Sequence, residues 1–209
     1  MTAVMLDRLS FAADYGVGDA AMARLDAYVA LLAEWQERMN LVAASTLADV
    51  WQRHVADSAQ VAALVDANDA TVWIDIGSGA GFPALVLALL CPGTFHLIEA
   101  TAKKCAFLAA AAASLGVADR VVIHNRRIEA LPPFAADIVT ARACAALTQL
   151  FTWGAPFGGR AQWALLKGRT VADEVAVAAR EFTFDHRLVA SRTDDEARIV
   201  VARNVRRRR

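Results

Sequence analysis

The residues best suited to bind a ligand lie in one short stretch, Thr71 to Pro83, which reads TVWIDIGSGAGFP. Its first part is mostly apolar and rich in strand-forming residues, which predicts a buried strand of a parallel sheet. Glycine then occupies every second position, at Gly77, Gly79 and Gly81, and Pro83 opens an apolar helix. Glycines at such a turn let a ligand approach the backbone closely. The stretch therefore predicts a ligand-binding turn between a strand and a helix.

The spacing of the glycines indicates which ligand this turn suits. A dinucleotide-binding turn has the pattern G-x-G-x-x-G, whereas here the pattern is G-x-G-x-G, with Phe82 where the third glycine would stand. Asp75, just before the glycines, would repel a pyrophosphate but suits the ammonium group of an amino-acid-bearing cofactor. The combination resembles motif I of the class I S-adenosylmethionine-dependent methyltransferases. A tight turn in an unrelated α/β protein is the alternative.

The segments around this turn alternate between strand and helix patterns. Strands are expected at 72–76, 94–99, 120–125, 136–140 and 161–166, with helices at 84–90, 102–115, 147–153 and 170–182, and a closing hairpin of 186–190 with 198–202. This order predicts an α/β fold with a doubly wound, mostly parallel sheet of the class I methyltransferase type.

An N-terminal helical extension is expected before the sheet. Apolar residues recur at helical spacing over 20–40 and again over about 47–65, and residues 66–70 form a polar linker. We therefore divide the chain into an extension, 1–68, and a cofactor-binding domain, 69–209. His54 lies on the apolar stripe of the second helix, with Asp57 next to it one turn further on. A satisfied packing role and a functional role are both open for His54.

Ligands in doubly wound sheets bind beyond the carboxyl ends of the strands, so polar residues there are candidates. Glu99 ends the second strand, 22 residues after the first glycine, where an acid can accept hydrogen bonds from both ribose hydroxyls of a nucleoside. The loop after the third strand holds Ile128, an apolar contact for an adenine ring, and Glu129. Arg142 follows the fourth strand and Lys167 the fifth.

Composition excludes several other classes of protein. The longest apolar runs fall short of the ~20 residues needed to cross a bilayer, so no membrane partner is expected. Three scattered cysteines form no metal-ligand spacing, which predicts no metal site and suits a reducing cytoplasm. The formal net charge is zero, so any nucleic-acid binding requires a local basic patch.

Several motifs together are similar to one known family. These are LLAEWQERMNLVA from Leu31, HVADS at 54–58, DIGSGAGFP, LIEATAKKCAFL at 97–108, NRRIE at 125–129, VTARACA at 139–145 and LLKG at 165–168. The chain resembles the bacterial small-subunit ribosomal RNA guanine-N7 methyltransferases, also called the glucose-inhibited division protein B family. Two positions depart from the family pattern: Ala84 replaces a usual glycine and Gln36 a usual asparagine.

The resemblance implies S-adenosylmethionine as cofactor, contacted at Gly77, Phe82, Ile128, Glu129 and Arg142. It implies as substrate a guanine in the 530 loop of 16S rRNA within the 30S subunit, modified in the cytoplasm, and we expect the enzyme to be a monomer. As residues acting on the substrate we take Arg142, Asp57 and Lys167.

Candidate RNA contacts are basic, namely Arg126, Arg127, Arg142, Lys167 and the tail 206–209. Two alternatives remain. One is a methyltransferase of the same fold with a small-molecule or protein substrate. The other is a non-catalytic RNA-binding module.

Overall fold

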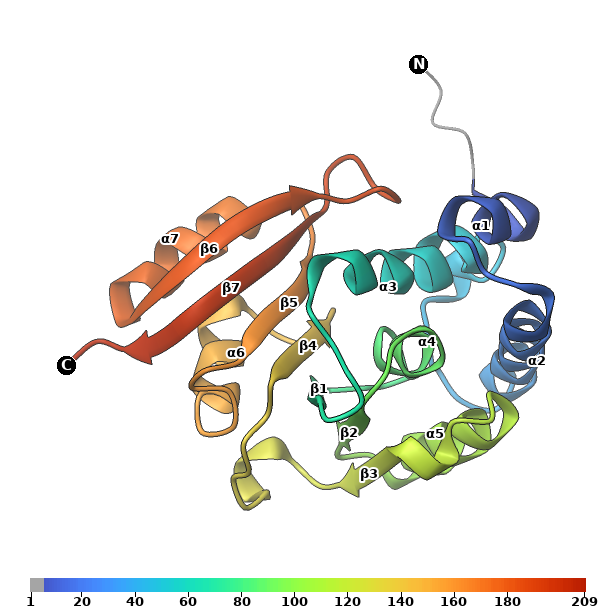
Figure 1. Cartoon of the computed structure of the whole chain (residues 1–209), viewed down its shortest axis with the longest axis horizontal. Coiled ribbons are helices and arrows are strands. Elements are labelled where there is room, and N and C mark those ends of the chain that lie inside the picture. The colour runs from blue at the N-terminus through green and yellow to red at the C-terminus, as the bar shows by residue number, and fades with distance from the viewer. Residues whose placement is uncertain (1–5) are drawn as a thin grey trace.

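The computed structural model describes residues 6–209, and they form one seven-stranded sheet covered by helices on both faces (Figure 1). The strands are β1 (Val72–Ile76), β2 (Thr94–Glu99), β3 (Val121–Asn125), β4 (Ile138–Arg142), β5 (Gln162–Lys167), β6 (Phe182–Ala190) and β7 (Arg198–Arg207). Their order is β3-β2-β1-β4-β5-β7-β6. The first five run parallel, and β7 pairs antiparallel with β5 and β6.

Alternate residues of the central strands are buried on opposite faces, as the period of a strand requires. On β1, Trp73 packs into the apolar cluster under the N-terminal helices, whereas Ile74 packs into the cluster under the C-terminal helices. The first face carries α1 (Arg8–Tyr15), α2 (Asp19–Gln36), α3 (Asp57–Ala59), α4 (Ala84–Leu90) and α5 (Ala102–Ser114). The second carries α6 (Leu147–Gly154) and α7 (Val171–Glu181). The doubly wound, mostly parallel sheet expected from the sequence is confirmed.

The first two helices of the N-terminal region differ from their prediction. Helix α1 was not expected, because its eight residues are too few to show a period; the Asp7 carboxylate caps it by accepting from the Ser10 amide at 2.8 Å. The helix expected at 20–40 ends at Gln36, whose side chain accepts from the amides of Leu41 and Val42 at 2.9 and 3.1 Å and so turns the chain.

The helix expected at 47–65 is not regular. It consists of a π-helical stretch (Trp51–Ala56), α3 and a 3-10 stretch (Gln60–Leu64), which follow one another as a single coiled segment in Figure 1. A separate 3-10 turn (Ala44–Thr46) precedes it. π-helical turns are rare and occur frequently at functional sites. The residues of this segment are therefore candidates for a functional site.

Two boundaries near the C-terminal half also differ. Arg142 is the end residue of β4 itself and does not follow the strand. The closing hairpin is longer than predicted, since β6 begins directly after α7 and β7 continues to Arg207.

Between Leu6 and Arg209 no helix is both long enough and apolar enough to cross a membrane.

Candidate active site

A cavity of about 1290 Å³ lies at the carboxyl ends of β1, β2, β4 and β5. Strand order reverses between β1 and β4, and ligands bind at such a switch point in doubly wound folds. Three parts of the chain line the cavity: the loops after these strands, the N-terminal residues 40–57, and the turn between β6 and β7. The cavity is therefore the place where the sequence-predicted residues must meet if they form one site.

The glycine turn after β1 forms one wall of this cavity. Gly79 has φ +56°, and a Cβ built there would meet only the Gly77 carbonyl oxygen, at 3.8 Å, so it would project into open space. A Cβ at Gly77 would stand 2.3 Å from Sγ of Cys144, and one at Gly81 would stand 2.5 Å from Leu85. Gly79 thus leaves room for a ligand. The other two glycines allow packing, and Gly81 does not line the cavity.

Glu99 lies next to this turn, at the end of β2. Its Oε2 accepts from the Gly79 amide at 3.1 Å and its Oε1 from the Thr101 amide at 2.7 Å. The side chain is largely buried but lines the cavity. Because each carboxylate oxygen has a second lone pair, Glu99 can still accept hydrogen bonds from ligand hydroxyls.

Asp75 is buried beneath the glycine turn and does not line the cavity. Its Oδ1 accepts from the Thr140 hydroxyl at 2.7 Å, whereas Oδ2 has no partner among the described residues. Burial raises the pKa of Asp75 to about 6. A buried carboxylate oxygen without a donor is costly. Because the carboxylate lies beneath the turn and outside the cavity lining, its expected contact with the ammonium group of a cofactor stays a prediction.

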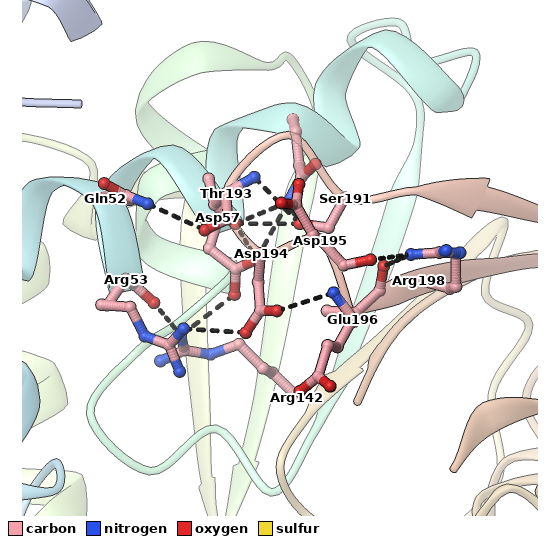
Figure 2. Close-up of polar contacts among 12 residues, drawn as sticks. Gln52, Arg53, Asp57, Arg142, Ser191, Thr193, Asp194, Asp195, Glu196 and Arg198 are labelled. Carbon is pink, nitrogen blue, oxygen red and sulfur yellow. Dashed lines mark hydrogen bonds and ion pairs between the residues drawn. The ribbon is translucent and has the colours of Figure 1, made fainter. Parts of the chain in front are cut away.

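Arg142 enters the cavity from the end of β4 and is held by the N-terminal segment (Figure 2). Its Nη1 donates to the Arg53 carbonyl at 2.9 Å and to Oδ2 of Asp57 at 3.3 Å, and its Nη2 contacts Nδ1 of His54 at 2.8 Å. The guanidinium also lies 5.1 Å from the centre of the Phe82 ring, a cation–π distance. Asp57 is therefore the acidic partner of Arg142.

His54 is buried in this arrangement, and its protonation state follows from its neighbours. Burial, then the charges of Arg142 and Arg53, lower its pKa to about 3, so the ring is neutral near pH 7. Since Arg142 can only donate, Nδ1 must accept and Nε2 must carry the proton. The Thr46 hydroxyl, which donates to the Ala43 carbonyl at 2.6 Å, then accepts from Nε2 at 2.7 Å. His54 is therefore a fully hydrogen-bonded residue that also fixes Arg142.

The remaining predicted residues divide between the cavity and the protein interior. Lys167 lines the cavity, but Glu174 lies 2.7 Å from its Nζ and the Ala145 carbonyl accepts from it, so its charge is already paired. Ile128 is buried in the cluster beneath α6, and Glu129 is exposed; neither lines the cavity.

The predicted basic contacts lie in two different places. Arg126 and Arg127 are exposed just after β3, at the edge of the sheet that carries the cavity. The tail 206–209 lies elsewhere: β7 starts opposite Lys167 beside the cavity and runs antiparallel, so Arg206 is at the other end of the sheet.

Several residues around the cavity were not predicted. The backbone carbonyl of Arg53 and the hydroxyl of Thr193 are among them, and both act through contacts between segments far apart in the sequence. Tyr28 donates from α2 to the carbonyl of Ala80 within the glycine turn. Thr193 had no signal in the sequence, since no motif or period includes it.

Solved structures that superpose on this chain include S-adenosylmethionine-dependent methyltransferases. An O-methyltransferase of this kind from Thermotoga maritima superposes with a TM-score of 0.58 at 17% identity, over 87% of this chain and 72% of that chain. A methyltransferase from Aquifex aeolicus gives 0.57 at 13% identity, over 74% and 91%. The fold is therefore that of the class I S-adenosylmethionine-dependent methyltransferases.

The sequence comparisons then define the family. The family model described as rRNA small subunit methyltransferase G (GidB) matches residues 21–199 of this chain. Relatives named ribosomal RNA small subunit methyltransferase G include one from Rhodospirillum rubrum, 46% identical over 91% of this chain and 94% of the relative. One from Caulobacter vibrioides is 42% identical over 97% and 94%. The chain belongs to the rRNA small subunit methyltransferase G family.

Proposed function

We propose that this protein transfers a methyl group from S-adenosylmethionine to N7 of a guanine in 16S rRNA. The observation that carries the proposal is the cavity itself, in which the open space at Gly79 and the Glu99 carboxylate stand on one side and the fixed guanidinium of Arg142 on the other. Membership of the family supports both the cofactor and the class of substrate.

The residues present fit the cofactor. Gly79 leaves space for it, and Glu99 offers free lone pairs to ribose hydroxyls. When bound, S-adenosylmethionine supplies an electrophilic methyl group on a sulfonium. Gly77 and Phe82 line the same cavity. The assignment of Asp75 rests on the sequence motif, and that of Ile128 and Glu129 on the family resemblance, because none of the three lines the cavity.

Methylation of guanine N7 does not require the protein to transfer a proton. Guanine N7 has an exposed lone pair and no proton, so no general base is required. The chain contributes by positioning the base and excluding water, which is worth up to about 7–11 kcal/mol in well-oriented reactions. The neutral His54 and the ion-paired Lys167 are consistent with positioning roles.

Arg142 is the residue we assign to the incoming guanine. A guanidinium has five N–H donors; two of those on Nη1 and one on Nη2 are used within the protein. One Nη2 hydrogen and the Nε hydrogen remain for the substrate. They suit O6 of guanine or a flanking phosphate, because a bond to N7 itself would block the reaction. Asp57, beside Arg142, places a carboxylate near the positive charge that the base gains.

The proposal has further parts, which rest on the family resemblance for the nucleotide and the subunit and on the sequence patterns for the rest. The guanine lies in the 530 loop, the substrate is presented by the 30S subunit, and the enzyme works as a monomer in the cytoplasm. Residues 69–209 are the catalytic domain and residues 1–68 an extension of it. Helix α2 of this extension packs against α5, so the extension shares a core with the sheet.

The test is to incubate the protein with methyl-labelled S-adenosylmethionine and 30S subunits from cells that lack this modification, and to map the labelled nucleotide. We expect label at N7 of one guanine of the 530 loop. Label on ribosomal protein alone, or on another base, would overturn the assignment of substrate. Cofactor binding by calorimetry without transfer to any ribosomal component would favour the non-catalytic module.

A further inference from the structure

The turn between β6 and β7, residues 191–197, is bound to the helical segment 51–64, which carries the partners of Arg142 (Figure 2). Loops that connect surface strands are ordinarily exposed and mobile. Here Thr193 is only 6% exposed. Its carbonyl accepts from the Gln52 side chain at 3.0 Å, and the amide of Arg192 donates to Gln60 at 2.9 Å. Asp194 forms an ion pair with Arg53 at 2.9 Å.

One contact in this interface leads directly to Arg142. The Thr193 hydroxyl donates to Oδ1 of Asp57 at 2.9 Å, and Asp57 uses its other oxygen, Oδ2, for Arg142. Gln60 also donates to Oδ1, at 2.9 Å. Two donors on one oxygen fix the plane of the carboxylate, and that plane sets where Oδ2 meets the guanidinium. Thr193 is well suited to this because its branched Cβ restricts its rotation.

We propose that Thr193 is a positioning residue for methyl transfer, which orients the Arg142 guanidinium in the cavity by holding the Asp57 carboxylate. The proposal rests on the proposed function, since Arg142 matters here as the group that meets the guanine. Arg142 keeps its contacts with His54 and the Arg53 carbonyl when the hydroxyl of Thr193 is lost. Loss of the hydroxyl should therefore change the orientation of the guanidinium, while the guanidinium stays in the cavity.

The variant that removes only the hydroxyl is Thr193→Val, which keeps the shape of the side chain. We expect kcat on 30S subunits to fall about tenfold, with the KM for RNA and the Kd for S-adenosylmethionine within twofold of wild type. Thr193→Ser restores the hydroxyl and should recover most of kcat. The matched control is Thr183→Val, on the same hairpin. Among the described residues its exposed hydroxyl donates only to the Arg206 carbonyl, so this variant should behave as wild type.

A double-mutant cycle shows whether the effect passes through Asp57. In an Asp57→Ala background, Thr193→Val should cause less than a twofold further loss, because the acceptor for the Thr193 hydroxyl is gone. A full additional tenfold loss would show that Thr193 acts elsewhere. Unchanged kcat in a folded Thr193→Val protein with a lowered Tm would reduce Thr193 to a structural role and overturn the proposal.

A second measurement keeps this test separate from that of the proposed function. Side-chain ¹⁵N–¹H signals of Arg142, assigned by their loss in Arg142→Lys, report the ordering of the guanidinium without any substrate. We expect slow-exchanging signals in wild type and Thr183→Val, and broadened or averaged signals in Thr193→Val. If wild type transfers no methyl group to rRNA, these spectra still decide whether Thr193 orients Arg142. Identical spectra for all three proteins would contradict the proposal.

Discussion

The two sides of the cavity are built in different ways. The side around Gly79 and Glu99 consists of neighbouring loops, and the contact that joins them spans 20 residues of sequence. The side around Arg142 is assembled from side chains that lie 85 residues apart for Arg142 and Asp57, and 136 apart for Thr193 and Asp57. A wall made of backbone turns can be recognised in a sequence motif, whereas a wall made of long-range side-chain contacts becomes visible only in the folded chain.

The largest effect is expected when a side chain is placed in the open space beside the glycine turn. Gly79→Val should abolish S-adenosylmethionine binding, because its side chain would occupy open cavity space. Calorimetry on the folded variant measures this. The control is Gly16→Val, since Gly16 has a similar φ of +63° with nothing near its Cβ position; it imposes comparable backbone strain away from the cavity. Normal affinity of a folded Gly79→Val protein would refute the assignment of the turn.

Glu99→Gln tests the same side with a smaller change. The loss of a hydrogen bond to a charged group costs about 1.5–3 kcal/mol, which predicts cofactor binding that is roughly 10- to 150-fold weaker. The side-chain amide nitrogen of the new glutamine would also face the backbone N–H of Gly79 or of Thr101, which is a donor against a donor. Titration calorimetry decides the matter. If affinity follows Asp75→Asn and ignores Glu99, the ribose contact belongs to another residue.

Arg142→Ala tests the side made of long-range contacts. Methyl transfer to 30S subunits should fall at least tenfold with little change in cofactor affinity, and Arg142→Lys should recover only part, because an ammonium lacks the planar fork. Tm should also fall, because Asp57, whose side chain is only 18% exposed, would lose its ion-pair partner. Transfer at the wild-type rate would remove Arg142 from the site.

The smallest effect is expected at the outer edge of this side. Asp194→Asn breaks an exposed ion pair with Arg53, so its cost should stay within about 0.2–1 kcal/mol. Hydrogen bonding to Arg53 lowers the pKa of Asp194. A carboxylate with a lowered pKa stabilises the fold above its unfolded pKa, and this contribution disappears as pH falls through the folded value. Denaturant melts should therefore separate the two proteins at pH 7 and not at about pH 2.

The predictability of the fold follows the same division. Strands 72–76 and 94–99 have the bounds expected from the sequence, since buried parallel strands are mostly apolar runs. Gly79 and Glu99 were found because a motif and a strand end mark them. The break after Gln36 depends on a side chain folding back on the chain. The link from Thr193 to Asp57 depends on the completed sheet, and the pairing of Lys167 by Glu174 likewise crosses between elements.

The place of β7 between β5 and β6 has a consequence for how this protein emerges during synthesis. Chains are made from the N-terminus, and domains begin to fold as they appear. β6 is made before β7, and among the described strands it pairs only with β7. Until residues 198–207 exist, β6 has no described strand to join and residues 191–197 have no fixed position beside Asp57. The contact between Thr193 and Asp57 is therefore among the last parts of the site to form, after the residues of the glycine turn and Arg142 itself have been made.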